Sequence, residues 1–394
     1  MINKQWKASS VLMVVCIFFI ALNMRPAVTA IGPLYNVLLE SLHISNTKMS
    51  FLTSIPVFCM GLFAPIAVPL QKKMGTKTAI TLLILLLALA NGLRFLKESY
   101  GLLVVTSFLA GFAIALIGPM LNAYIKKKFP TRFTTVVGIY SFGIGTGATL
   151  SAALTVTFYR HFDGSWTIAL GSWSILALSA LIMWYLLVQK EEQKLSGKDE
   201  NSEHLIRNPW KSFRAWTILI YFGLQTSLFF SVMSWLVPIL QDKGYSLGEA
   251  SSILTFMSFI QMIGNIVVPI LMEKWTSRLT WLFALGILGI LGFALLWVGS
   301  GKLLLMAVFI IGITLSGLFP IGLLLPLDEA ETNEEANSWS SMVLSGGFII
   351  SAIIPIVIGY CYDITGNHTV TFAIFMIIMI AIMATTYRLK KSSL

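Results

Sequence analysis

The chain has 394 residues, of which 57% are hydrophobic and only 11% are charged, and its formal net charge is +10. Soluble globular domains carry about 25% charged residues, so this composition excludes a soluble protein, and the high hydrophobicity excludes intrinsic disorder. The basic residues lie in short clusters between apolar runs, which is typical of membrane topology signals and not of a nucleic-acid-binding surface. We therefore expect the lipid bilayer, and no nucleic acid, as a partner.

Twelve apolar stretches occupy nearly the whole chain, and each is long enough for a helix that crosses a bilayer, which needs about 20 residues. Barrel strands would be shorter and would alternate in polarity, so helices are the expected form. The fold class that we expect is all-α integral membrane, with twelve transmembrane helices as two pseudo-symmetric six-helix bundles. The helices are predicted near 9–39, 46–70, 77–97, 101–125, 132–158, 165–188, 214–240, 247–272, 279–299, 302–326, 337–361 and 368–387.

The first predicted helix follows Lys4 and Lys7 without a clear cleavage site, so we expect it to be retained. It contains Arg25, and an arginine at the centre of a membrane helix costs about 3 kcal/mol on insertion scales. No acidic residue lies in the interior of a predicted helix to neutralise this charge, so Arg25 should face a water-filled cavity. The alternative is a structural arginine that is bonded to carbonyls of neighbouring helices.

Pro26 directly follows Arg25, and because proline lacks an N–H it should kink the first helix at this point. Asn23, Arg25 and Thr29 would then form a polar, cationic patch at the break. An arginine fork donates several hydrogen bonds in fixed geometry, which suits a planar or oxyanionic ligand.

Weaker candidates for substrate binding lie elsewhere in the first half. Arg94, near the outer end of the third predicted helix, either lines the outer vestibule or extends to the lipid headgroups. Asn122 and Tyr124 in the fourth helix and Tyr140 in the fifth are polar, but polar residues commonly join helices in lipid. The glycines of the fifth helix indicate close packing or bending, and no nucleotide-binding lysine follows them; they are Gly143, Gly145 and Gly147.

The stretch 189–210 is the only long polar segment of the sequence, and it contains charges of both signs. It predicts a cytoplasmic linker, 189–213, between an N-terminal six-helix bundle, 1–188, and a C-terminal one, 214–394. Basic residues dominate one side of the predicted topology, so that side and both termini should be cytoplasmic, although one acidic loop also falls there. The basic residues are Lys72, Lys73, Lys77, Lys126, Lys127, Lys128, Arg132, Arg388, Lys390 and Lys391, and the acidic ones are Asp328, Glu329, Glu331, Glu334 and Glu335.

The seventh predicted helix carries Tyr221, Gln225 and Phe229 along one stripe, with Trp235 near its edge. A buried glutamine amide both donates and accepts hydrogen bonds, so Gln225 would orient a small polar solute while the aromatic rings close the cavity around it. Helix packing is the alternative for each aromatic residue.

The sequence offers no catalytic dyad or triad and no metal cluster, because its acidic residues and histidines fall in loops or at helix ends. We therefore expect no enzyme and no cofactor. Weak repeats between the two halves, such as Gly111 and Pro119 against Gly312 and Pro320, are typical of transporters whose halves rock about a central site. Chance similarity of apolar, proline-containing sequence is the alternative.

Two groups of six helices, a charged linker and a basic loop, PLQKKMGTKTA, resemble the major facilitator superfamily. Lys72 replaces the usual aspartate of that loop, and Ser107 stands where many proton-coupled relatives have an arginine, which disfavours an ordinary proton-coupled drug antiporter. The motifs LNMRPAVTAIGPL and FGLQTSLFFSVMSWLVPILQDKGYS resemble the cyanate permease and 2-nitroimidazole transporter family within it. That resemblance implies a cavity lined by helices 1, 4, 7 and 10, and Arg25 and Gln225 match the motif positions.

The function that we expect is secondary active or facilitative transport of a small, anionic or polar planar solute, such as cyanate. Transport would proceed by alternating access around a central site with Arg25, in a monomer in the cell membrane. One alternative is an exporter of nitroimidazole or other drug-like compounds. Another, from a different class, is a non-transporting membrane sensor, against which the short loops count.

Overall fold

The computed structural model describes residues 8–188, 208–274, 278–329 and 332–391, and over these ranges it contains helices and no strand. Twelve of its helical spans are long and apolar enough to cross a membrane. The predicted fold class is therefore confirmed, and each predicted helix agrees with a span to within a few residues. The spans are Ser9–Leu42, Asn46–Met74, Thr76–Phe95, Tyr100–Lys128, Thr135–His161, Trp166–Leu187, Phe213–Asp242, Leu247–Met272, Thr280–Val298, Gly301–Glu329, Glu335–Thr365 and Thr369–Leu389.

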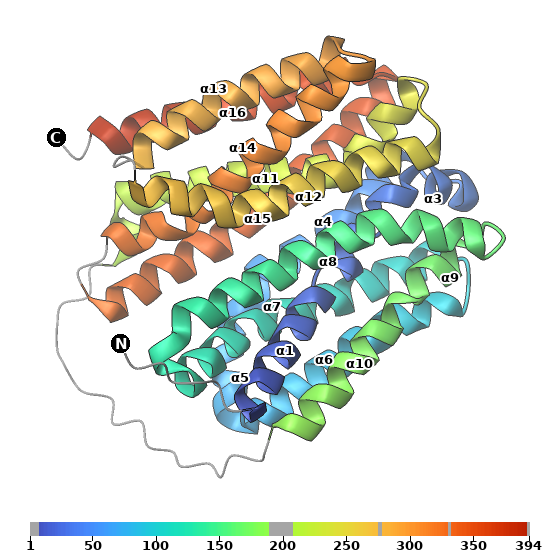
Figure 1. The fold of residues 1–394 in the computed structure, drawn as a ribbon. Coiled ribbons are helices and arrows are strands. Elements are labelled where there is room, and N and C mark those ends of the chain that lie inside the picture. The colour runs from blue at the N-terminus through green and yellow to red at the C-terminus, as the bar shows by residue number, and fades with distance from the viewer. Residues whose placement is uncertain (1–7, 189–207, 275–277, 330–331, 392–394) are drawn as a thin grey trace.

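The helices fall into two groups in space, which are the first half and the second half of the chain (Figure 1). The first half contains α1 (Ala8–Asn23), α2 (Pro26–Thr29), α3 (Tyr35–Leu42), α4 (Asn46–Phe63), α5 (Ala67–Met74), α6 (Thr76–Gly92), α7 (Tyr100–Lys128), α8 (Phe133–His161), α9 (Trp166–Gly171) and α10 (Trp173–Leu187). The second half contains α11 (Phe213–Asp242), α12 (Leu247–Lys274), α13 (Arg278–Val298), α14 (Gly301–Glu329), α15 (Asn333–Thr365) and α16 (Thr369–Lys391). The residue limits expected for the two bundles and the linker stay a prediction, because residues 189–207 of the linker lie outside the described residues. Lys4, Lys7 and Glu331 also lie outside them.

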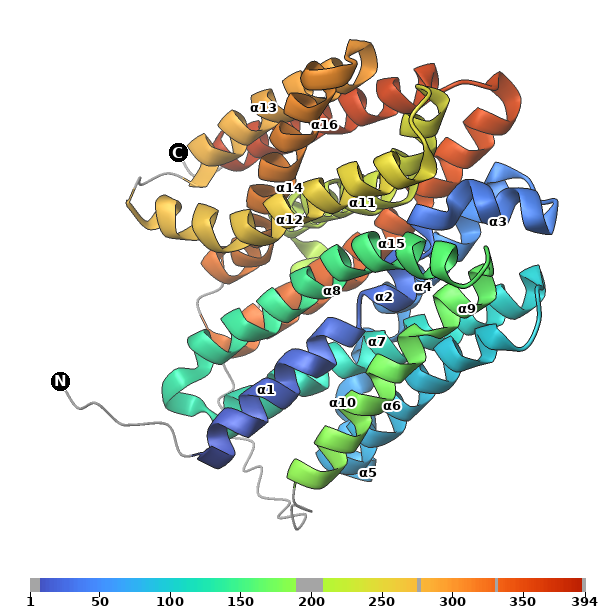
Figure 2. The same ribbon diagram turned by 45° about the vertical axis from the view of Figure 1, so that its right-hand side comes forward.

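The two halves meet along two pairs of long helices, α4 with α15 and α8 with α12. The start of α1 and the end of α16 lie on the same side of the molecule (Figures 1 and 2). We call this side the terminal end, and the opposite side, where α3 and α9 lie, the far end. Both halves contribute helices to each end, so a solute that passes between them would contact both.

The first membrane span is broken in the middle, as Pro26 predicts. α1 ends at Asn23, α2 begins at Pro26, and a short 3-10 turn, Gly32–Leu34, leads into α3. Across the break, backbone hydrogen bonds span three residues and not the four of an α-helix. The Met24 N–H donates to the Ala21 carbonyl at 3.1 Å, and the Val28 N–H donates to the Arg25 carbonyl at 2.9 Å. A proline inside a helix removes one donor and clashes with the preceding turn, which accounts for the break.

The glycines of α8 allow very close helix packing, which is one of the two roles expected from the sequence. A Cβ built on Gly147 would lie 2.1 Å from the carbonyl oxygen of Leu22, the group that Pro26 leaves without a helical donor. A Cβ on Gly143 would lie 2.8 Å from the Phe18 carbonyl oxygen, so α8 and α1 touch backbone to backbone. The broken helix is thus held from one side by α8.

We expect Gly147→Ala to lower the apparent unfolding temperature of the purified protein, because the new methyl group must push α1 and α8 apart. Overpacking of this kind costs about 1–3 kcal/mol. Gly138→Ala is the matched control on the same helix, since a Cβ there meets no atom within 4 Å. Thermal unfolding in detergent, followed by size-exclusion chromatography, should separate the two variants, and equal stability would contradict the packing described here.

Candidate functional site

Arg25 lies at the break between α1 and α2 and points toward the other half of the protein. Its guanidinium carbon lies 5.2 Å from the centre of the Phe229 ring and 5.5 Å from that of Phe230, both on α11. The side chain of Arg25 is only half-buried. Since rings of the opposite half flank it, the guanidinium lies at the interface between the halves. That Arg25 faces a water-filled cavity stays a prediction.

No ion pair neutralises Arg25 within the described part of the chain. Each cation–π contact contributes about 0.5–2 kcal/mol, but an aromatic ring carries no net charge and so does not neutralise the arginine. The site therefore retains an excess of positive charge. The five N–H donors of the Arg25 guanidinium are set in a planar fork that matches an anion or a planar acceptor.

Two other candidates from the first half lie next to Arg25. The Thr29 hydroxyl donates to the Arg25 carbonyl at 2.8 Å and shares a hydrogen bond of 2.7 Å with the hydroxyl of Ser151 on α8. The Tyr140 hydroxyl donates to the sulfur of Met24 at 3.8 Å and lies within electrostatic range of Arg25. Thr29 thus fixes the backbone at the break, and Tyr140 borders the charge.

Two of the remaining candidates in the first half, Asn23 and Tyr124, have structural partners, and a third, Asn122, is exposed. Asn23 donates to the carbonyls of Phe19, at 2.7 Å, and of Leu176, at 3.1 Å, so it joins α1 to α10. The Tyr124 hydroxyl donates to the sulfur of Met13 at 3.6 Å, and its ring packs edge-on against Trp184. None of these contacts brings the three residues to Arg25, and their role in binding stays a prediction.

Arg94 does not extend to the headgroups, contrary to one of the two expectations from the sequence, because its side chain is fully buried. One guanidinium nitrogen, Nη2, donates to the Ala27 carbonyl at 3.2 Å, and Nε donates to the Thr106 hydroxyl at 3.3 Å. These acceptors offset part of the cost of burying the charge, and the third guanidinium nitrogen, Nη1, is buried without a hydrogen-bond partner among the described residues. Arg94 therefore supports the backbone that follows Pro26.

The α11 candidates divide between the centre and the far end of the molecule. Gln225 is buried one helical turn from Phe229 on the same face, and its amide donates to the Thr226 hydroxyl at 2.6 Å. The Tyr221 hydroxyl donates to the Leu318 carbonyl of α14 at 2.9 Å. The ring of Trp235 packs instead against those of Tyr35, at 4.7 Å, and Tyr362, at 5.8 Å, and so belongs to the far end.

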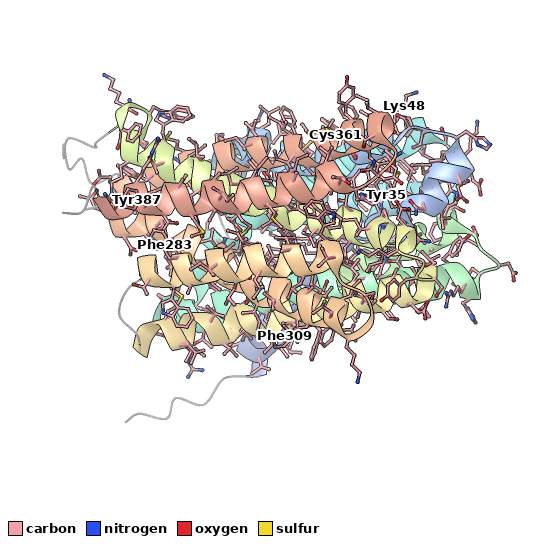
Figure 3. All side chains as sticks on the ribbon, turned by 90° about the horizontal axis from the view of Figure 1, so that it is seen from above. Tyr35, Lys48, Phe283, Phe309, Cys361 and Tyr387 are labelled. Carbon is pink, nitrogen blue, oxygen red and sulfur yellow. The ribbon has the colours of Figure 1, made fainter. Side chains whose placement is uncertain are left out.

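The far end is closed by a carboxylate of the second half that caps a helix of the first half. Asp363 of α15 accepts hydrogen bonds from the backbone N–H groups of Asn46 and Thr47, both at 2.8 Å, and from their side chains at 2.9 and 2.6 Å. These residues begin α4, where unpaired N–H groups and the helix dipole favour an anion. Tyr35, Lys48 and Cys361 mark this closed end in Figure 3.

Sequence reasoning missed this closure because its partners are 317 residues apart. Ser45, Asn46 and Thr47 do signal the start of a helix, but no local pattern indicates that Asp363 would cap it. The neighbouring contact between Asn36 and Gln241, at 3.1 Å, also joins the halves and was likewise unpredicted.

Comparisons with known proteins identify similar chains over almost the full length. The Major Facilitator Superfamily profile matches residues 12–352. The chain is 28% identical over 377 residues to the cyanate transport protein CynX of Escherichia coli (strain K12), which covers 95% of this chain and 96% of the relative. It is 25% identical over 374 residues to the 2-nitroimidazole transporter of the same organism, with 91% and 90% covered. The resemblance inferred from the sequence motifs is thus confirmed.

Solved structures of transporters share the fold. A D-xylose-proton symporter superposes with a TM-score of 0.80 at 12% identity, covering 96% of both chains. The nucleoside transporter NupG superposes with a TM-score of 0.78 at 11% identity, covering 96% of this chain and 99% of its own. At such low identity these similarities define the arrangement of helices and leave the bound solute open.

We expect Asp363→Asn to loosen the far end, because an asparagine presents one acceptor oxygen and one NH2 group to four donors. The reporter is Ser54→Cys, in a background without native cysteines. Ser54 is buried on the same face of α4 as Gly61, which packs against the Ser345 carbonyl of α15, so this face becomes accessible only when the halves separate. Its reaction with a membrane-impermeant maleimide should become several-fold faster.

Glu98→Gln is the control for Asp363→Asn, because Glu98 is an exposed carboxylate of the far end that bonds to Ser41 within the first half. It should leave the labelling rate unchanged. Equal rates in the two variants would show that the cap on α4 does not hold the far end closed.

Proposed function

We propose that this chain, which belongs to the Major Facilitator Superfamily and is a multi-pass membrane transporter and not an enzyme, moves a small, anionic or polar planar solute such as cyanate. The observation that supports this proposal is Arg25, which meets no carboxylate among the described residues and faces rings of the opposite half. An anion held between the halves would supply the missing charge. Membership of a transporter superfamily argues against the sensor alternative.

The solute class follows from the chemistry around Arg25. The arginine fork can donate two parallel hydrogen bonds to an oxyanion or a nitro group, and the faces of Phe229 and Phe230 favour a flat or linear ligand. The solutes in the names of the two relatives, cyanate and 2-nitroimidazole, fit a linear ligand and a flat ligand respectively. Export of a nitroimidazole or another drug-like compound is the second candidate, and the aromatic rings favour it.

Alternating access requires a solute that contacts both halves, because a ligand shifts a conformational equilibrium only through differential contacts. Arg25 comes from the first half, and Phe229 and Gln225 come from α11 of the second. Since the far end is closed by the cap on α4, we infer that the solute in this state exchanges with the terminal end. We assign that end to the cytoplasm of a cell-membrane monomer, because the basic residues Lys72 and Lys73 end α5 there.

We expect Arg25→Ala to abolish saturable anion binding and Arg25→Lys to retain the charge but lose much of the affinity, since a lysine lacks the planar fork. Binding of cyanate and other small anions to purified protein, measured calorimetrically, would test both variants. Lys97→Ala is the control, because it removes one exposed positive charge at the far end. Wild-type affinity in folded Arg25→Ala protein would refute the assignment.

Gln225→Ala should weaken substrate binding roughly tenfold without changing the fold, because loss of one buried hydrogen bond to a ligand costs about 0.5–1.5 kcal/mol, and more when the partner is charged. Ser227→Ala, on the same helix, is the control, since the Ser227 hydroxyl bonds to the Gly223 carbonyl of its own helix. A substrate-bound structure in which the Gln225 amide stays on Thr226, away from the ligand, would contradict this role.

The absence of acidic residues and histidines from the predicted membrane interior leads us to expect electrogenic uniport or anion exchange and not proton symport through a side chain. An inside-negative potential opposes entry of a monovalent anion by about 2.3 kcal/mol per 100 mV, so an uncoupled carrier would favour export. Flux into liposomes under a pH gradient, with the potential clamped at zero, checks this. Concentrative uptake of an anion that stays ionised throughout would overturn the expectation.

A further inference from the structure

A histidine and an aspartate pair at the far end of the second half. His368, between α15 and α16, is only 7% exposed, and its Nε2 atom lies 3.3 Å from the Oδ2 atom of Asp242 at the end of α11. The Tyr362 hydroxyl donates to the same carboxylate oxygen at 2.7 Å. The other ring nitrogen of His368 lies 3.3 Å from the Thr371 hydroxyl. The proposed transport site does not use this group.

The pair is connected directly to the far-end closure. The His368 ring lies 4.6 Å from that of Tyr362 and 5.7 Å from that of Trp235, and Trp235 packs at 4.7 Å against Tyr35 of the first half. Asp363, which caps α4, directly follows Tyr362 in the chain. Separation of the halves at the far end would therefore disturb the surroundings of His368.

Water from the far end can reach the pair. A cavity of about 520 Å³ lies beside it, lined among others by Asp242, Tyr362, His368 and the stacked rings of Trp297 and Phe372. Asn367 and Thr369, which also line this cavity, are exposed. Because the cavity opens at the far end, a proton taken up there returns to the same compartment.

The charges around His368 disfavour its protonated form while the far end is closed. Burial lowers the pKa of His368 from 6.5 to about 4, and the charge of Lys243 acts in the same direction while that of Asp242 opposes it. The ammonium of Lys243 donates to the Trp297 carbonyl at 2.8 Å. The groups that face His368 from α15 and, through Trp235, from α3 are the neutral phenols of Tyr362 and Tyr35.

We propose that Asp242 and His368 form a proton-binding site, open to the far compartment, whose protonation releases the far-end closure. A histidine that is neutral when buried and protonates when exposed favours the exposed state as the pH falls. The effect begins near the ordinary pKa of histidine and saturates below the pKa of the buried state. Between pH 7.5 and 5.5 the ratio of open to closed protein should rise about tenfold.

The test is double electron–electron resonance on protein in lipid nanodiscs, without substrate, from pH 7.5 to 4.5. Spin labels replace the exposed residues Lys97 and Lys302, one in each half at the far end, in a background without native cysteines. The proposal rests on the alternating access proposed for this transporter. Because the measurement uses no solute, a negative result would refute this proposal and leave the assignment of the anion to Arg25 untouched. We expect a longer-distance population that grows as the pH falls.

The variants His368→Gln and His368→Phe should both abolish this pH dependence. His368→Phe keeps a ring against Trp235 and Tyr362, so it serves as the test if His368→Gln does not fold. His161→Gln, which replaces an exposed histidine of the first half, should respond as the wild type does. The proposal is overturned by a wild-type distribution that does not change with pH or that shifts toward closure in acid. A response that persists in both His368 variants would also overturn it.

Discussion

An arginine at the centre of a membrane helix, with no carboxylate beside it in the described part of the chain, is the constraint on which the rest of this structure depends. Pro26 breaks the helix beside it, the bond from Thr29 fixes the break, and Gly147 lets α8 pack against the Leu22 carbonyl, which lacks its helical donor. All of these contacts hold the backbone and leave the guanidinium of Arg25 pointed at the second half. A charge in this position costs about 3 kcal/mol or more, and we propose that its exposed face binds the solute.

Arg94 shows how the same fold treats an arginine that serves structure. It is fully buried, and it donates to the Ala27 carbonyl and the Thr106 hydroxyl. Arg25, in contrast, is half-buried between two phenylalanine rings of the other half. Arg25 lies within the helix break and faces the interface between the halves, whereas Arg94 supports the backbone just after the break through the Ala27 carbonyl. This difference is the main physical reason to assign the solute to Arg25.

The sequence predicts the membrane spans and the helix break because both follow from local rules: apolar length for the spans and a missing N–H for Pro26. It does not predict contacts between residues far apart in the chain. Trp235 follows the Gln225 stripe in sequence, yet two further turns of helix carry it to the far end, against Tyr35. His368 is predicted at the start of a helix, where exposure is expected, but in the structure it lies between α15 and α16 and is buried against the ends of α11 and α15. Asp363 likewise acquires its role only when α15 meets α4.

The central claim is that Arg25 binds the solute between the two halves, and anomalous diffraction from crystals soaked in selenocyanate tests it most directly. Selenocyanate is a linear anion similar to cyanate, and its selenium atom is located without reference to the protein density. We expect one strong peak near the Arg25 guanidinium, between Phe229 and Tyr140. A selenium peak at Arg94 or Lys243 with none at Arg25, from protein that binds the anion in solution, would contradict the account.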